Sequence, residues 1–194
     1  MISDNALSAD SVGSGLQTNE GAHEKLKAGG VFHVKCYDAE GNLKWEHEEH
    51  NLVVNVGLQD MNAKYFTGSA YTATWYIGLW GAAASNTPAA GDTMASHAGW
   101  TEFVNYSQAN RPTATFGVPT TANPSVATNS ASPATFTISG AGGTVGGAFL
   151  TSNNTKSGTT GILFSGSDFT SPGDRATVSG DTLTVTYTFS LTAT

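Results

Sequence analysis

The chain has 194 residues and a mass of 20.0 kDa, with 39% hydrophobic and 12% charged residues. This length fits one domain and is enough to bury a core without help from a metal or a disulfide. The 23 glycines and 27 threonines exclude a coiled coil and favour a β-rich fold with many turns. The low charged fraction also excludes a chain that is disordered throughout.

The formal net charge is −7, from 8 basic and 15 acidic residues. No cluster of basic residues is present, so direct contact with nucleic acid is not expected. The single cysteine, Cys36, excludes an intrachain disulfide. We also expect no membrane span, because no run of about 18 apolar residues occurs. The first residues lack the pattern of a signal peptide, so the chain is expected to be made and kept in a reducing cytosol, or to leave the cell by a route other than secretion.

Residues 1–30 predict a polar N-terminal arm, because large apolar residues there are too sparse to fix a strand. One helical turn over residues 23–27, stopped by Gly29 and Gly30, is compatible with this composition. Two interpretations of the arm stay open: a flexible tail, or a segment that orders by lying on a neighbouring subunit. Residues 31–194 are expected to form a single β-domain.

The β-domain opens with a predicted hairpin. Residues 31–37 alternate and place Phe32, Val34 and Cys36 on one face, and residues 43–47 return after a turn. A short apolar run at 51–55 extends or follows the hairpin.

The periodicity then changes over residues 56–66, which predict the one helix of the chain. Asn55 is its expected N-cap. The apolar residues that fall at helical spacing are Leu58, Met61, Tyr65 and Phe66.

Strands dominate the rest of the chain. The segment at 82–99 predicts a loop with a short turn near 92–97. The final strand is the clearest, because its apolar residues alternate with Thr and Ser without a break. The predicted strands cover residues 71–80, 100–106, 113–118, 134–139, 145–151, 161–165 and 182–192. The fold class is therefore mainly β: an antiparallel β-sandwich, with a jelly roll as one arrangement, one short helix and an extended N-terminal arm.

Residues 46–50, Glu-His-Glu-Glu-His, form the densest cluster of ionisable side chains. His47 and His50 are three apart, whereas a zinc-protease helix places its histidines four apart. On a strand the two rings point to opposite faces and share no ion. We therefore favour a solvated acidic end of the hairpin over a structural metal. His33 and His97 stand alone, as hydrogen-bonding residues of the surface or core usually do.

Two other clusters were weighed for ligand binding. Asp168, Asp174 and Asp181 offer oxygen ligands for calcium, but carboxylates are also ordinary turn residues, so both interpretations stay open. The glycines at 140–143 predict a turn rather than a phosphate loop, because no lysine or helix follows.

The aromatic residues Trp75, Tyr76, Trp80 and Trp100 are interpreted as core, with a carbohydrate platform as the alternative. Cys36 lies on the apolar side of its strand, which predicts a buried thiol rather than a nucleophile. Glu102 with an aspartate of 168–181 is the only carboxylate pair that a glycosidase mechanism could use. No catalytic, cofactor-binding or metal-binding residue is therefore predicted, and the chain is not expected to be an enzyme.

Several short motifs resemble small structural proteins of tailed bacteriophages, of the capsid cement or decoration class. They are residues 51–58, 76–79, 99–102, 110–112 and 180–187. The resemblance implies a non-enzymatic virion protein on the capsid surface, made in the host cytoplasm, that stabilises the shell across capsomer boundaries. The implied partners are the major capsid protein and further copies of the chain, as a dimer or trimer. The alternative is a tail, neck or fibre module that recognises a host glycan through exposed aromatic residues such as Trp80 or Trp100.

Overall fold

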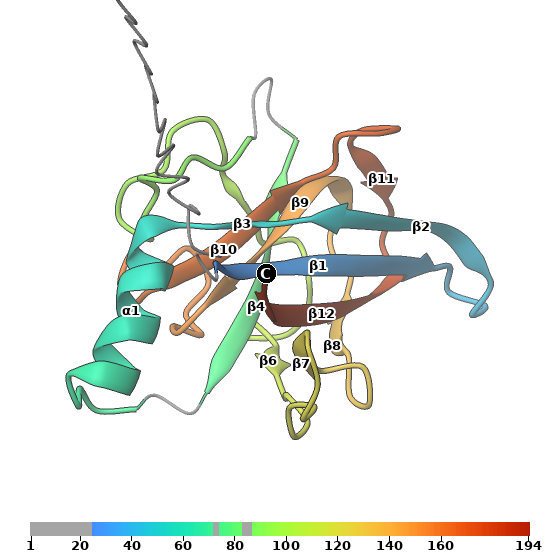
Figure 1. Ribbon diagram of the computed structural model, residues 1–194. Coiled ribbons are helices and arrows are strands. Elements are labelled where there is room, and N and C mark those ends of the chain that lie inside the picture. Colours follow the sequence, from blue (N-terminus) through green and yellow to red (C-terminus); the bar gives the residue numbers. More distant parts are fainter. Residues whose placement is uncertain (1–24, 72–73, 83–86) are drawn as a thin grey trace, which may run out of the picture.

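The computed structural model describes residues 25–71, 74–82 and 87–194 (Figure 1). Twelve strands and one helix lie within them. Their bounds are β1 Leu26–Tyr37, β2 Leu43–His50, β3 Leu52–Val53, α1 Asn55–Phe66, β4 Trp75–Gly81, β5 Glu102–Phe103, β6 Thr113–Ala114, β7 Ser125–Thr128, β8 Ala134–Thr137, β9 Gly143–Thr151, β10 Leu163–Asp168, β11 Arg175–Thr177 and β12 Thr182–Ala193. No described helix has the length and apolar character needed to cross a membrane.

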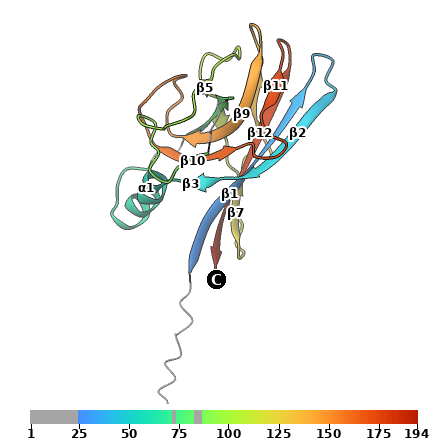
Figure 2. The same ribbon diagram turned by 90° about the horizontal axis from the view of Figure 1, so that it is seen from above.

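The strands form two antiparallel sheets that pack face to face. One sheet has the order β2-β1-β12-β7, with β8 also paired to β12. The other has the order β3-β10-β9-β4-β5, with β11 paired to β9 and β6 paired to β4. Figures 1 and 2 show the two layers crossing in space. The predicted mainly β, antiparallel sandwich with one helix is confirmed, whereas the strand order does not confirm a jelly roll.

The central pair of the first sheet is β1 with β12. Their register runs without a shift from Leu26 opposite Ala193 to Tyr37 opposite Thr182. The predicted alternation is confirmed, because the apolar residues of each strand are buried where the two sheets face each other. The fully buried members are Phe32, Val34, Cys36, Leu183, Val185 and Tyr187.

Strand β1 begins five residues earlier than the sequence predicts. Gly29 and Gly30 lie inside the strand instead of ending a helical turn, and residues 25–27 are extended beside β12. Gly30 is required there, because a Cβ atom would lie 2.7 Å from the Thr188 carbonyl and the Tyr187 hydroxyl. The rest of the predicted arm, residues 1–24, lies outside the described residues.

The early start of β1 produces an overhang, which we define as residues 25–30, 188–194 and 125–128. Strand β2 pairs with β1 only from Val31 onward, so the first residues of β1 pair only with β12 among the described strands. Strand β7 pairs with β12 from Thr188 to Leu191 on its other side. In Figure 2 these strand ends project beyond the rest of the two sheets, and the C-terminus lies at their tip.

The predicted helix is confirmed, but its cap and its buried face are not. Val54 is the N-cap and makes no side-chain capping bond, and Asn55 is already the first helical residue. Only Gly57 is buried. Of the predicted apolar face, Met61 packs against the core, whereas Leu58, Tyr65 and Phe66 are exposed. The helix docks through a glycine because Gly57 lies directly against the Phe164 backbone of β10.

Several strand predictions differ in extent. Strands β5 and β6 have two residues each, where residues 100–106 and 113–118 were predicted. Strand β4 begins at Trp75 rather than residue 71, and residues 72–73 lie outside the described ranges. Strands β7 and β11 were not predicted. The predicted turn at 140–143 is confirmed, with Gly142 donating its backbone N–H to Ser139 and holding φ at 70°.

The close docking of α1 gives a test of the fold. In Gly57→Ala the added Cβ would clash with the Phe164 carbonyl oxygen. We expect a loss of about 1–3 kcal/mol in the free energy of unfolding, because overpacking outweighs the gain in helix propensity. Urea denaturation measures it, with Gly91→Ala as the control because nothing lies within 4 Å of its added Cβ. Equal stability of the two variants would contradict the docking.

Candidate functional site

The histidines of the 46–50 cluster do point apart, as strand geometry predicts. His47 is buried and packs on Phe169, with ring centroids 4.3 Å apart and planes tilted by 38°, whereas His50 is exposed on the other face of β2. His47 Nε2 lies 3.5 Å from Glu49 Oε2, and Glu49 also accepts hydrogen bonds from Thr170. Burial lowers the pKa of His47. The end of the hairpin is therefore only partly solvated, because His47 and Glu49 hold β2 against the loop after β10.

The three aspartates considered for calcium do not meet. Asp181 is buried and accepts hydrogen bonds from Lys44 Nζ at 2.6 Å and Val178 N at 2.9 Å. Asp168 and Asp174 lie elsewhere, and burial followed by the charge of Asp174 raises the pKa of Asp168. Within the described ranges, no group of three or more His, Cys, Asp and Glu side chains is arranged to hold a metal ion.

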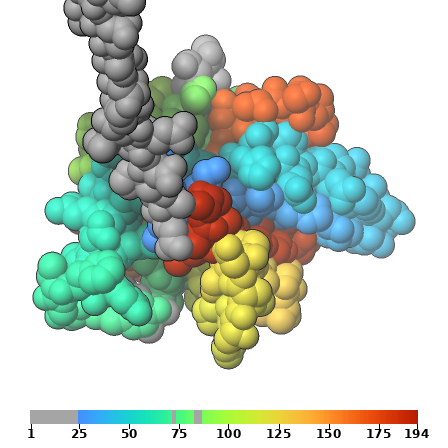
Figure 3. All heavy atoms as spheres, viewed as in Figure 1, coloured from blue at the N-terminus to red at the C-terminus, as the bar shows by residue number. Residues whose placement is uncertain are grey.

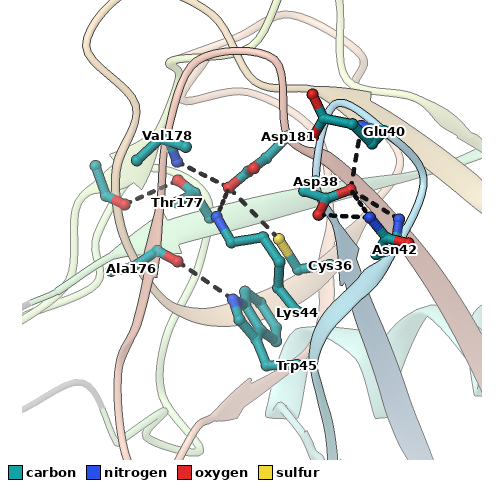
Figure 4. A network of polar contacts seen from close by, with 11 residues as sticks. Cys36, Asp38, Glu40, Asn42, Lys44, Trp45, Ala176, Thr177, Val178 and Asp181 are labelled. Atoms are coloured by element: carbon teal, nitrogen blue, oxygen red, sulfur yellow. Dashed lines mark hydrogen bonds and ion pairs between the residues drawn. The ribbon is translucent and has the colours of Figure 1, made fainter.

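Cys36 belongs to the same network as Asp181, which Figure 4 shows from close by. Its Sγ lies 3.7 Å from Asp181 Oδ2, the oxygen that Lys44 also contacts. Burial, and then the charge of Asp181, raises the pKa of the thiol to about 12. The thiol therefore stays protonated at neutral pH. Its burial confirms the prediction of a buried side chain. The network ties the β1–β2 hairpin to the start of β12.

Glu102 does not face an aspartate but forms a two-point ion pair with Arg111. Arg111 Nε donates to Glu102 Oε1 and Nη2 donates to Oε2, both at 2.8 Å, and both side chains are buried. Arg111 Nη1 also donates to the Asn153 carbonyl, and the Ser157 backbone N–H donates to Glu102. This clamp joins β5, the segment before β6 and the loop after β9. Two of the resemblance motifs, residues 99–102 and 110–112, thus meet in a structural contact.

The aromatic residues suggested for sugar binding are mostly core. Trp80 and Trp100 are buried, with ring centroids 4.8 Å apart, and they pack on Phe149. His97 stacks on Trp100 at 3.6 Å. The hypothesis that Trp80 or Trp100 forms an exposed platform is therefore wrong. Trp75 is only half-buried, and it faces a different part of the surface.

Trp75 lines a groove of about 540 Å³ between α1, the β4–β6 pair and the β7–β12 pair. Its wall is mainly apolar and includes Trp75, Phe116, Phe164 and Phe189. Figure 3 looks onto this end of the domain, with α1 on one side and β7 and the last residues of β12 on the other. The volume and the apolar lining are typical of a binding site. The described lining residues include no Ser, Cys or His that could act as a nucleophile or base.

The charged groups of the groove neutralise one another. Lys64 Nζ lies 3.4 Å from Asp60 Oδ1 one helical turn away, and it donates a hydrogen bond to the Ala70 carbonyl. Exposed aromatic side chains lie in the groove and on the helix that borders it: Tyr71, which lines the groove, is 74% exposed, and Tyr65 and Phe66 on the last turn of α1 are 84% and 77% exposed. We define the apolar end as the groove together with these three residues. Its mainly apolar wall suits contact with apolar groups of a partner.

Comparisons of the chain with protein-family models, with curated proteins and with solved structures found no match. The apolar end was not predicted from the sequence. Its residues come from α1, from six strands, β4, β6, β7, β9, β10 and β12, and from the loops between them, so no single stretch of the sequence carries the pattern.

The buried His47 gives a pH test. Its lowered pKa means that the folded state holds a neutral ring where the unfolded chain binds a proton. The resulting stability is present above the unfolded pKa of about 6.5 and is lost as the pH falls through that value. We expect His47→Gln to flatten the fall in unfolding free energy between about pH 7.5 and 5. His50→Gln, which changes an exposed ring, is the control. If the unfolding free energy falls with the same slope in the wild type and both variants, the buried ring of His47 is not the cause of the pH dependence.

The Arg111 clamp gives a test of stability. Arg111→Met leaves Glu102 buried without its cation, and we expect a loss of about 3–5 kcal/mol in chemical denaturation. Lys35→Met removes an ion pair to a mostly exposed Glu46 and should cost less than about 1 kcal/mol. Adding Glu102→Met to Arg111→Met should recover part of the loss. If it does not, the unpaired carboxylate is not the cause.

Proposed function

We propose that this chain is a non-enzymatic structural protein of a phage virion that binds the outside of the capsid as a cement or decoration protein. Its partners are the major capsid protein and further copies of itself. The observation that carries the proposal is the apolar end: an apolar groove lined by Tyr71, with the exposed Tyr65 and Phe66 on the last turn of α1, the helix that forms one wall of the groove. Monomeric soluble proteins rarely expose a continuous apolar surface unless it binds a partner. The resemblance of the short motifs supports the choice of a capsid shell as that partner.

The mechanism is the burial of this surface across a boundary between shell subunits. Such contacts exist only when the shell is assembled, so binding shifts the equilibrium toward the assembled state. The charged clusters of the domain support this role indirectly. Glu102, Asp181 and His47 all serve contacts between strands and loops, which leaves the surface as the functional part.

The second candidate is a tail, neck or fibre module that binds a host glycan. Trp80 and Trp100 no longer support it, because both are buried. Trp75 and Tyr71 line the groove and are the aromatic residues that a sugar ring would contact. Glycan-array binding that is lost in Trp75→Ala would favour this candidate over the shell protein.

The copy number of the chain in purified particles separates the two candidates. Quantitative mass spectrometry against the most abundant shell protein should give hundreds of copies per particle for a cement protein. A few to a few dozen copies would support a tail or fibre position instead. Absence from the particle would contradict both.

The apolar end can be tested by substitution. We expect Tyr65→Ser with Phe66→Ser to weaken binding to shells stripped of this protein by at least about tenfold, because buried aromatic residues dominate interface energies. Both side chains are exposed, so the fold should be unaffected. Val178→Ser removes an exposed apolar residue of the loop after β11 and is the control. Equal binding of both variants and the wild type would contradict a role for the apolar end.

A further inference from the structure

The overhang has one open strand edge. Lys25 and Thr194 exchange backbone hydrogen bonds of 2.6 and 2.9 Å, so the odd-numbered residues of β1 pair toward β12. The even-numbered residues point to the opposite side, where the Gly30 carbonyl accepts a bond from Asn51 N at 3.0 Å. No described strand pairs with Leu26 or Ala28 on that side. Their N–H and C=O groups thus form a short template to which another strand can add.

The inner face of the overhang is apolar. Leu26 and Ala28 lie on the same face of β1 as the buried Phe32, and their partners on β12 are Ala193 and Leu191. Leu26 is 68% exposed. The same face of β12 carries Phe189, which lines the groove. A strand added beside Leu26 and Ala28 would therefore place alternate side chains next to the apolar end.

The charge of the overhang differs from that of the rest of the molecule. The overhang carries Lys25 and Lys27 and no acidic side chain, whereas the whole chain has a net charge of −7. Residues 1–24, which join the overhang at Lys25, carry four acidic residues and neither Lys nor Arg. Within them, Val12 and Leu16 fall on one face of an extended strand. This segment thus has the opposite net charge to the overhang and apolar side chains for its inner face. Its four acidic residues are all even-numbered, as Val12 and Leu16 are, so the attraction to Lys25 and Lys27 acts at long range and not as a direct contact.

We propose that residues 1–24 of one copy bind the open edge of β1 on an adjacent copy, adding a strand that directs Val12 and Leu16 toward the apolar inner face. The inference deepens the proposed function and rests on it for the setting, a shell surface on which copies lie close together. Eight residues, 17–24, separate Leu16 from Lys25 and span up to about 28 Å when extended. That length allows the segment to reach a neighbour. Each copy then supplies one segment and one edge, so such contacts can link copies in series or in a closed ring.

Self-association of the isolated chain tests the proposal, measured by sedimentation velocity over a range of concentrations. We expect the full chain to associate and two variants to remain monomeric: one lacking residues 1–24, and one carrying Ala28→Pro. The proline removes an N–H that points to the open edge and leaves the bonds to β12 intact. Mixing these two variants should restore a one-to-one complex, since one supplies the edge and the other the segment. A full chain that stays monomeric would overturn the proposal. This outcome also covers a chain whose residues 1–24 bind the open edge of the same copy.

Matched substitutions identify the contacts. Leu16→Asp should abolish association, whereas Leu7→Asp, on the opposite face of an extended segment, should not. Lys27→Glu should weaken association about two- to fivefold at low salt, and Lys35→Glu, on the same face of β1 beyond the overhang, should not. Circular dichroism checks the fold of each variant. Equal effects within the first pair would overturn the proposed register, and equal effects within the second pair would overturn the long-range charge attraction.

This result is independent of the copy number in particles. A chain that is abundant on particles but monomeric in solution would overturn the arm contact alone. A chain that associates through its arm but is absent from particles would overturn the proposed function alone.

Discussion

The pairing of β1 with β12 is the constraint on which the rest of the structure depends. These strands lie side by side at the centre of one sheet, and their register is continuous over twelve residue pairs. A slip of one residue would turn Phe32 and Val185 toward solvent, because successive side chains of a strand face opposite ways. Each fully buried large apolar side chain contributes about 1.5–3 kcal/mol, so the register is strongly fixed within the sandwich. Because the pair is continuous, that same register fixes the overhang.

The two central strands were predictable because each one carries its own pattern. Thr182 to Thr192 alternates without a break, and residues 31–37 alternate over a buried face. The first five residues of β1 were missed because Gly29 and Gly30 favour a break locally. Their extended conformation comes from β12, which lies more than 150 residues away along the chain. Strands β7 and β11 have four and three residues, too few for a period to be detected.

The helix and the ion pairs show the limits of local patterns in another way. The periodicity of residues 56–66 predicts a helix correctly, but of its four apolar residues only Met61 packs against the core, because α1 docks by backbone contact at Gly57. Lys44 and Asp181 are 137 residues apart, so no motif search would join them. Glu102 and Arg111 are only nine residues apart. Because the loop between them is short, their ion pair could have been predicted from the sequence. Strand parity, in contrast, predicted correctly that His47 and His50 face apart.

The overhang supports the proposal that this end of the domain acts by burying its surface against a partner. The alternation of β12 continues through Leu191, beyond Phe189, whose ring still contacts Phe164 of the opposite sheet. A pair of strands with water on both faces does not need apolar residues on one of them. Ordering its backbone is also unfavourable in conformational entropy. A pair of strands that receives a partner on its inner face recovers that free energy when the contact forms. The apolar alternation past the end of the sandwich, the open edge of β1 and the exposed aromatic residues of α1 are what the proposed assembly requires, because it buries that end of the domain.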